Sequence, residues 1–175
     1  MFYNNLGWAL LKLVEWGETQ VPQGIAIDTG NKVFDTALLS EKFLHRSISL
    51  NTQNKLSHAN LCLLYSTPAF REVDRKRYLT RCRYYGKKAL LLDPKYINGN
   101  RDLAIALVRY GELDEAYSYY SGALQLSSDP DKKDEVIKDV VDELYRLKNL
   151  DELVALSQYK LDNWKMPNGV SPQSK

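Results

Sequence analysis

The chain has 175 residues, of which 44% are hydrophobic and 26% are charged, and its formal net charge is +2. These values are ordinary for a soluble globular protein, and the length suffices for one domain with a hydrophobic core. The two cysteines are too few for a disulfide framework, which is compatible with a reducing compartment.

Secondary-structure signals favour helices throughout the chain. Few segments alternate apolar and polar residues, and runs rich in Val, Ile and Thr are scarce, so we expect an all-α protein. The most apolar stretch, Leu6 to Val14, is interrupted by Lys12 and is too short to span a membrane. It also has neither a basic leader nor a cleavage site. We therefore predict no membrane segment in this chain and a cytoplasmic location.

The first predicted helix pair consists of Asn5 to Leu11 and Ser40 to Leu50. The stretch between them, residues 17–31, contains the helix breakers Pro22, Gly24 and Gly30. We predict a long insertion loop there. Its role stays open among an ordered cover over one face, a partner-binding element and a flexible excursion.

A second predicted pair begins with Gln53 to Tyr65. Its partner helix takes its apolar face from residues spaced three or four apart, namely Tyr78, Cys82, Tyr85 and Ala89. The turn between the two helices contains Pro68 and no glycine. Because Cys62 and Cys82 fall on opposite helices among apolar residues, we expect two buried, unreactive thiols.

The stretch from Asn100 to Ser128 carries the strongest pattern in the chain. Gly111 marks a tight turn near its middle. The half before the turn has an apolar stripe at Leu103, Leu107 and Val108. The half after it places two small residues and an aromatic one on a single face, at Ala116, Tyr120 and Ala123. Such a hairpin cannot bury both apolar faces alone, so it predicts neighbours of the same shape.

A fourth pair is predicted at the C-terminal end. Asp134 to Leu147 would be its first helix, and residues 149–153 repeat the acidic start that follows Gly111, with Leu153 in place of a small residue. We expect this pair to pack less closely and to act as a terminal cap. The repeat domain would span residues 1–163, and residues 164–175 are predicted to be a disordered tail.

The spacing of Leu103-Ala104, Gly111, Ala116, Tyr120 and Ala123 resembles the tetratricopeptide repeat (TPR). The copy at Asn98–Ser128 is the strongest, and degenerate copies lie on both sides. Asn100 stands where the family prefers Trp, and the proline that often ends the repeat comes late, at Pro130. The resemblance implies a right-handed superhelical array of antiparallel helix hairpins, a TPR-like α-solenoid with about four hairpins.

The resemblance also implies a concave groove that binds a peptide segment or a partner subunit, lined by the first helix of each hairpin. Carrying the groove positions over to this chain gives Asn4, Trp8, Gln53, Asn60, Leu63, Asn98, Arg101, Ile105, Val108, Glu135, Lys138, Asp142 and Tyr145. Asn side chains would hold a peptide backbone, and Arg101 and Lys138 would receive a carboxylate. The main anchors would be Trp8, Arg101 and Tyr145. Leu56 replaces the Lys of chaperone-binding members, so chaperone-tail binding is not expected.

The sequence offers little for catalysis. Its two histidines, His45 and His58, have no partner at ligand spacing, and Gly24 and Gly30 are too far apart for a phosphate loop. The acidic residues that follow Gly111 and those near Asp134 are typical of helix starts. We therefore predict a protein that is not an enzyme and has no metal, cofactor or small-molecule substrate.

Charge is distributed unevenly along the chain. Residues 71–88 hold eight Lys and Arg against two acids, whereas residues 112–162 are rich in acids. The basic residues either form a solvated face that meets the acidic half of the same or another copy, or contact phosphates.

Three functional hypotheses follow from the sequence. The leading one is a scaffold that binds a protein segment. The second is an accessory domain of a larger enzyme or membrane protein with the chemistry elsewhere. The least favoured is a module that binds nucleic acid or an anionic surface through residues 71–88. A homo-oligomer is compatible with all three, and the sequence does not encode the partner's identity.

Overall fold

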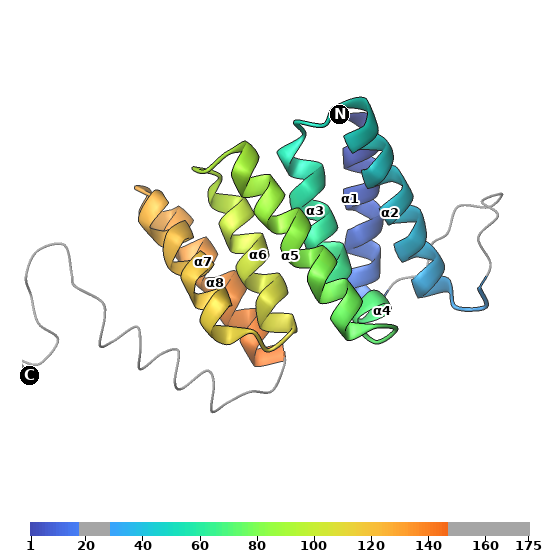
Figure 1. Ribbon diagram of the computed structural model, residues 1–175. Helices are drawn as coiled ribbons and strands as arrows, with labels where there is room; N and C mark the ends of the chain where they lie inside the picture. Colours follow the sequence, from blue (N-terminus) through green and yellow to red (C-terminus); the bar gives the residue numbers. More distant parts are fainter. Residues whose placement is uncertain (18–28, 147–175) are drawn as a thin grey trace, which may run out of the picture.

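A computed structural model describes residues 1–17 and 29–146 (Figure 1). These residues form eight α-helices and, within this part of the chain, no strand, which confirms the all-α prediction. None of the described helices is long and apolar enough to cross a lipid bilayer. In chain order the helices are α1 (Phe2–Trp16), α2 (Lys32–Leu50), α3 (Lys55–Ser66), α4 (Pro68–Arg71), α5 (Arg75–Leu92), α6 (Ile97–Arg109), α7 (Leu113–Leu126) and α8 (Pro130–Arg146).

Helices α1 and α2 approach each other closely at Gly7. A Cβ atom at this position would lie 2.6 Å from Cγ of Leu44 on α2. The Gly7 carbonyl also accepts a 2.7 Å hydrogen bond from the buried hydroxyl of Ser40. Only glycine, which has no Cβ atom, permits this approach of the two helices.

Helix α2 is longer than the sequence pattern indicated. It begins at Lys32 and not at Ser40, because the side chain of Asn31 accepts a 3.1 Å hydrogen bond from the amide of Phe34 and caps the helix. Of the predicted insertion at 17–31, residues 18–28 lie outside the described residues. Gly17, with φ at 71°, ends α1 in the left-handed conformation that glycine favours.

The second helix pair is α3 and α5, with the short α4 in the turn between them. Helix α3 is the most enclosed element, since every residue from 57 to 66 is buried. It packs against α1, α2, α5 and α6, which explains why its sequence is apolar on most sides and not on one stripe. Asp74 caps α5 by accepting a 3.0 Å hydrogen bond from the amide of Arg77.

Helices α6 and α7 form the pair that the strongest sequence pattern predicted. The turn is closed by Gly111, with φ at 72°, and by a 3.0 Å hydrogen bond from the Glu112 amide to the Leu107 carbonyl. The small residues at the contact between the two helices, Ala104, Ala116 and Ala123, are all buried.

Helix α8 packs on α6 and α7 through Val136, Val140 and Leu144, which are buried. It begins at Pro130, one turn before the predicted start at Asp134, since proline is favoured at the first helical position. The predicted second helix of the last pair and the predicted tail fall within residues 147–175, which lie outside the described residues.

The contacts between helices follow one order along the molecule. Helices α1, α3 and α6 each pack against their own partner, α2, α5 and α7 respectively. In addition, α1 contacts α3, α3 contacts α6, and α6 contacts α8. Figure 1 shows the result as a row of helices, with α1 and α2 at one end and α7 and α8 at the other. One face of this row is therefore built from α1, α3, α6 and α8.

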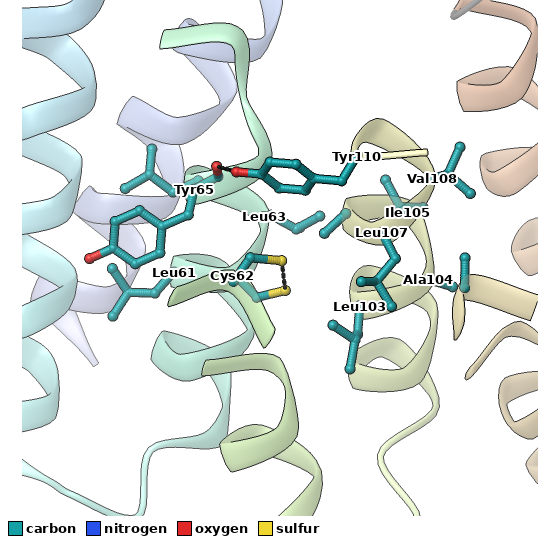
Figure 2. Packing of buried hydrophobic residues seen from close by; sticks show 14 of the residues in the cluster. Leu61, Cys62, Leu63, Tyr65, Leu103, Ala104, Ile105, Leu107, Val108 and Tyr110 are labelled. Carbon is teal, nitrogen blue, oxygen red and sulfur yellow. Dashed lines mark hydrogen bonds between the residues drawn. The ribbon is translucent and has the colours of Figure 1, made fainter. Parts of the chain in front are cut away.

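The hydrophobic core is continuous through this row of helices (Figure 2). At its centre the hydroxyl of Tyr110, at the end of α6, donates a hydrogen bond to the backbone oxygen of Tyr65. Cys62 and Cys82 are free thiols with no exposed surface and an Sγ–Sγ distance of 3.2 Å. Burial raises the pKa of the Cys62 thiol well above its ordinary value, which agrees with the prediction of buried, unreactive thiols.

Candidate binding cleft

A cleft of about 310 Å³ opens on the face made by α1, α3, α6 and α8. It is lined by Trp8, Lys12, Glu15, Trp16, Asn60, Leu63, Arg101, Asp102, Ile105, Arg109, Asp139, Asp142, Glu143 and Arg146. Six of the predicted groove residues are among them, namely Trp8, Asn60, Leu63, Arg101, Ile105 and Asp142. Side chains from Trp8 to Arg146, 138 residues apart in sequence, thus line one concavity.

The α1 side of the cleft carries two exposed tryptophans. Trp8 leaves 48% of its surface exposed and Trp16 leaves 67%. The Lys12 ammonium lies 5.8 Å from the centre of the Trp8 ring, one turn further along α1. Among the buried residues of the lining, Leu63 of α3 and Ile105 of α6 are apolar, whereas Asn60, Asp102 and Glu143 are polar.

A buried ion network joins three helices at the inner end of the cleft. The guanidinium of Arg109 makes a two-pronged contact with Glu143 of α8, with both N–O distances at 3.0 Å. A third nitrogen lies 3.0 Å from Glu15 of α1, which also pairs with Lys12 at 2.7 Å. The side chains of Arg109, Glu15 and Glu143 are 9 to 11% exposed.

The charges in this network stabilise one another against burial. Burial alone would raise the pKa of Glu15, but Arg109 and Lys12 outweigh it and hold the pKa below its ordinary value. Burial would likewise lower the pKa of Arg109, and the two carboxylates raise it instead. Glu15 and Arg109 are therefore both ionised at neutral pH.

Arg101 does not present free donors to a partner, contrary to the role that the sequence analysis gave it. Its nitrogens lie 3.1 Å from Asp102, 2.9 Å from Glu135 and 3.2 Å from Asp139. The guanidinium is thus surrounded by three carboxylates of its own chain. Burial raises the pKa of Asp102 in spite of the neighbouring Arg101. An incoming carboxylate would meet this acidic surrounding, so Arg101 is not suited to receive one.

The asparagines of the first two helix pairs bond to each other. The Asn4 side-chain oxygen accepts hydrogen bonds from Ser57 at 2.9 Å and from the Asn60 amide at 3.1 Å. Asn4 and Asn60 are both buried. Their polar groups therefore hold α1 against α3, where the sequence analysis expected them to hold a peptide backbone.

The remaining predicted groove residues are not part of the cleft lining. Gln53 is exposed in the turn before α3, and Asn98 lies in the first turn of α6. Lys138 and Tyr145 are exposed on another side of α8, and Tyr145 leaves 72% of its surface open. The two further positions carried over from the resemblance also fall elsewhere: Val108 is buried in the core and Glu135 is bonded to Arg101.

Several residues of the cleft were not predicted from the sequence, although their helical spacing from predicted groove residues indicates some of them. Arg109 lies one helical turn beyond Ile105 and two beyond Arg101, on the same side of α6. Lys12 lies one turn beyond Trp8, and Glu15 follows it at the spacing of an ion pair. Extending the predicted face by one turn on α6 and by two turns on α1 would have found all three.

The basic segment 71–88 is largely bonded within the molecule. Arg71 and Arg75 donate to the backbone oxygens of Arg109 and Tyr110 at the end of α6. The remaining contacts join side chains to acids on α2 and at the start of α7: Arg81 with Glu41, Arg83 with Glu112 and Glu115, and Lys87 with Glu115. These contacts support the reading in which the cations face acids of the same molecule.

The two histidines have structural partners. The His45 ring nitrogen lies 3.2 Å from the hydroxyl of Tyr65, and His58 lies 3.3 Å from the carbonyl of Thr52. Burial lowers the pKa of both rings below the ordinary value. Across residues 1–17 and 29–146, no three His, Cys, Asp or Glu side chains gather as they would to hold a metal ion.

Comparisons with protein-family models, with curated proteins and with solved structures give no match to this chain.

Proposed function

We propose that this protein is a non-catalytic, TPR-like scaffold that binds a segment of a partner protein in the cleft between α1, α3, α6 and α8. In this proposal the helix pairs are successive repeats of a right-handed superhelical array. The order of contacts supports it, because each first helix packs against its own partner and against the first helix of the next pair. The proposal holds equally if the chain is an accessory domain of a longer protein.

The observation that carries the proposal is Trp8. Trp8 leaves about half of its surface exposed and lines the same concavity as the buried, apolar Leu63 and Ile105. Large aromatic side chains next to a concave apolar floor supply most of the binding energy of protein interfaces. We therefore expect an apolar side chain of the partner segment to contact Trp8, Leu63 and Ile105.

The polar contacts of the segment are expected on the α8 side. Asp142 and Arg146 line the cleft, are exposed and have no ion pair among the described residues. Arg101 and Arg109 are already surrounded by carboxylates of this chain. The orientation of a bound segment would thus depend on Asp142 and Arg146, while the buried network gives the cleft its shape.

The test uses peptides selected from a random display library against the 175-residue chain. The affinity of the selected peptides is then measured by calorimetry for the native chain, for Trp8→Ala and for Asp142→Asn. We expect Trp8→Ala to weaken binding at least about tenfold, as expected for a central aromatic anchor. Asp142→Asn is expected to weaken it by a smaller factor and to change which peptides are preferred.

The controls are chosen for matched exposure outside the cleft. Tyr84 of α5 is 60% exposed, and Asp131 is exposed in the first turn of α8. Tyr84→Ala and Asp131→Asn should leave the affinity unchanged, and all variants should keep the native helical content by circular dichroism. Selected peptides that bind Trp8→Ala as tightly as the native chain would refute the cleft as the binding site.

A further inference from the structure

The outer side of α1 carries an apolar stripe that no described helix covers. It consists of Phe2, Leu6, Ala9, Leu13 and Trp16, at alternating spacings of four and three residues, and its last member, Trp16, also borders the cleft. This spacing places all five side chains on one side of the helix, as in the seam of a coiled coil. The opposite side, with Asn4, Gly7, Leu11 and Val14, is the one that packs into the protein.

The exposed fractions of the five side chains agree with a stripe on the outer side of α1. Phe2 and Trp16 leave 71% and 67% of their surface open, and Ala9 between them is exposed. Leu6 and Leu13 are half-buried, yet neither belongs to the hydrophobic core nor packs against it. Helix α1 also stands at one end of the row of helices (Figure 1), where no further described helix follows.

We propose that this stripe is a homodimer interface in which two copies of α1 pack antiparallel across a two-fold axis at Ala9. The order of side-chain sizes supports this arrangement, because it reads the same in both directions: large, medium, small, medium, large. The axis brings Ala9 against its own copy, so the two helices approach closely. It also places Leu6 against Leu13 and Phe2 against Trp16 of the second copy.

The charge distribution of α1 favours a second copy over other partners. Within a two-fold interface a charge near the axis meets its own copy, and like charges repel. Helix α1 has only two charged residues, Lys12 and Glu15. Both belong to the ion network of the cleft, so the stripe itself carries no charge. A membrane surface or nucleic acid would instead select for flanking cations, which this side of α1 lacks.

The size of the stripe sets the expected strength of the dimer. With about 200 Å² for an aromatic side chain, the exposed parts of Phe2 and Trp16 amount to about 300 Å². Two copies, with the leucines and alanines added, would bury on the order of 1,000 Å², the lower limit for specific interfaces. We therefore expect a reversible dimer with a dissociation constant in the micromolar range.

Sedimentation velocity of the 175-residue chain over a wide range of concentrations tests the dimer. We expect a monomer–dimer equilibrium that Ala9→Glu abolishes, raising the dissociation constant at least about tenfold, since an unpaired carboxylate becomes buried at the axis. Ser118→Glu, on the exposed surface of α7, is the matched control and should leave the equilibrium unchanged. Ala9 is exposed in the monomer, so the fold should survive, as circular dichroism would verify.

Cross-linking tests the direction of the pairing. Mixing Leu6→Cys with Leu13→Cys under mild oxidation should give a mixed disulfide dimer, whereas Leu6→Cys alone should give little. The native Cys62 and Cys82 are fully buried and do not compete. A chain that sediments as a monomer at every concentration would overturn the proposal. Binding to lipid vesicles that Ala9→Glu removes, without any dimer, would overturn it as well and assign the stripe to a membrane surface.

Discussion

Arg109 is the residue on which the inner end of the cleft depends. It is 9% exposed and contacts two carboxylates that are themselves about 10% exposed. Replacing it with Met keeps most of the volume but leaves Glu15 and Glu143 buried without their main counter-charge. We expect Arg109→Met to lower the free energy of unfolding by about 3–5 kcal/mol, measured by urea denaturation at neutral pH.

The exposed Arg146 provides the matched control for this substitution. It lines the same cleft but has no ion pair among the described residues. Arg146→Met should change stability by less than about 0.5 kcal/mol, as surface substitutions generally do. Equal stability of Arg109→Met and the native chain would show that the network contributes no net free energy.

Glu15 makes the stability of the protein decrease as the pH falls. Its pKa in the folded chain lies below 4.5, the ordinary value, because Arg109 and Lys12 outweigh burial. The ion pair of Glu15 therefore contributes fully to stability above about pH 4.5, where the Glu15 carboxyl is ionised in the unfolded chain as well. It is lost as the pH falls toward the lowered pKa, since protonation breaks the pair with Arg109.

Urea denaturation at a series of pH values from about 7 to 3 measures this effect. Asp102 titrates with the opposite sign, because burial raises its pKa. Asp102 is present in both chains, and Glu15 is the smallest cause of its raised pKa, so the comparison with Glu15→Gln reports mainly on Glu15. We expect the free energy of unfolding of the native chain to exceed that of Glu15→Gln at neutral pH, and this difference to disappear below about pH 4.5. A stability difference between the two chains that stays constant at every pH would contradict a lowered pKa of Glu15 in the folded chain.

Some residues of the cleft were predictable from the sequence, but their bonding partners were not. The resemblance to the repeat family placed Trp8, Ile105 and Asp142 in one groove, and the structure brings them together in the cleft. The bonding state of Arg101 could not be read from spacing, because its carboxylate partners lie on both its own helix and α8. Whether a polar group is free for a partner depends on contacts that only the folded chain makes.

The contact between α1 and α2 gives a prediction at the scale of elements. An added methyl group at Gly7 would lie 2.6 Å from Cγ of Leu44 and 3.3 Å from its backbone nitrogen. Because Leu44 is fully buried, the two helices must separate to accommodate it. We expect Gly7→Ala to destabilise the protein by about 1–3 kcal/mol in thermal or urea denaturation, in spite of alanine's higher helix propensity.

Asn5 on the same helix serves as the control for Gly7. It is exposed, so Asn5→Ala also adds favourable helix propensity, somewhat less than Gly7→Ala, without a steric conflict. A Gly7→Ala chain as stable as Asn5→Ala would mean that the two helices can shift apart at little cost.

The elements themselves were largely predictable, and their ends were not. Apolar periodicity found the helices on either side of Gly111, because that pattern is local. The start of α2 was missed by eight positions, since the Asn31 cap follows the helix breakers closely and was read as part of the loop. On α8, the positions assigned to the groove included Lys138 and Tyr145, whereas the cleft is lined by Asp139 and Glu143. That register is fixed by Val140 and Leu144 entering the core.

At the scale of the whole molecule, the helices are not equally enclosed. Helix α3 is buried from residue 57 to 66 and has neighbours on four sides, whereas α8 packs mainly on α6 and α7. Local opening requires fewer contacts to be broken at α8 than at α3. The ion pairs of Glu143 with Arg109 and of Asp139 with Arg101 are what oppose this opening on the cleft side.

Hydrogen exchange followed by mass spectrometry measures this difference. We expect amides of α3 to exchange slowest, by global unfolding, and amides of α8 to exchange faster by local opening. Glu143→Gln should accelerate exchange in α8 more than in α3, because it weakens the contact that holds α8 to α6. Equal acceleration in both helices would mean that the row unfolds as one unit. In that case the α8 wall of the cleft could not open independently of the rest of the molecule.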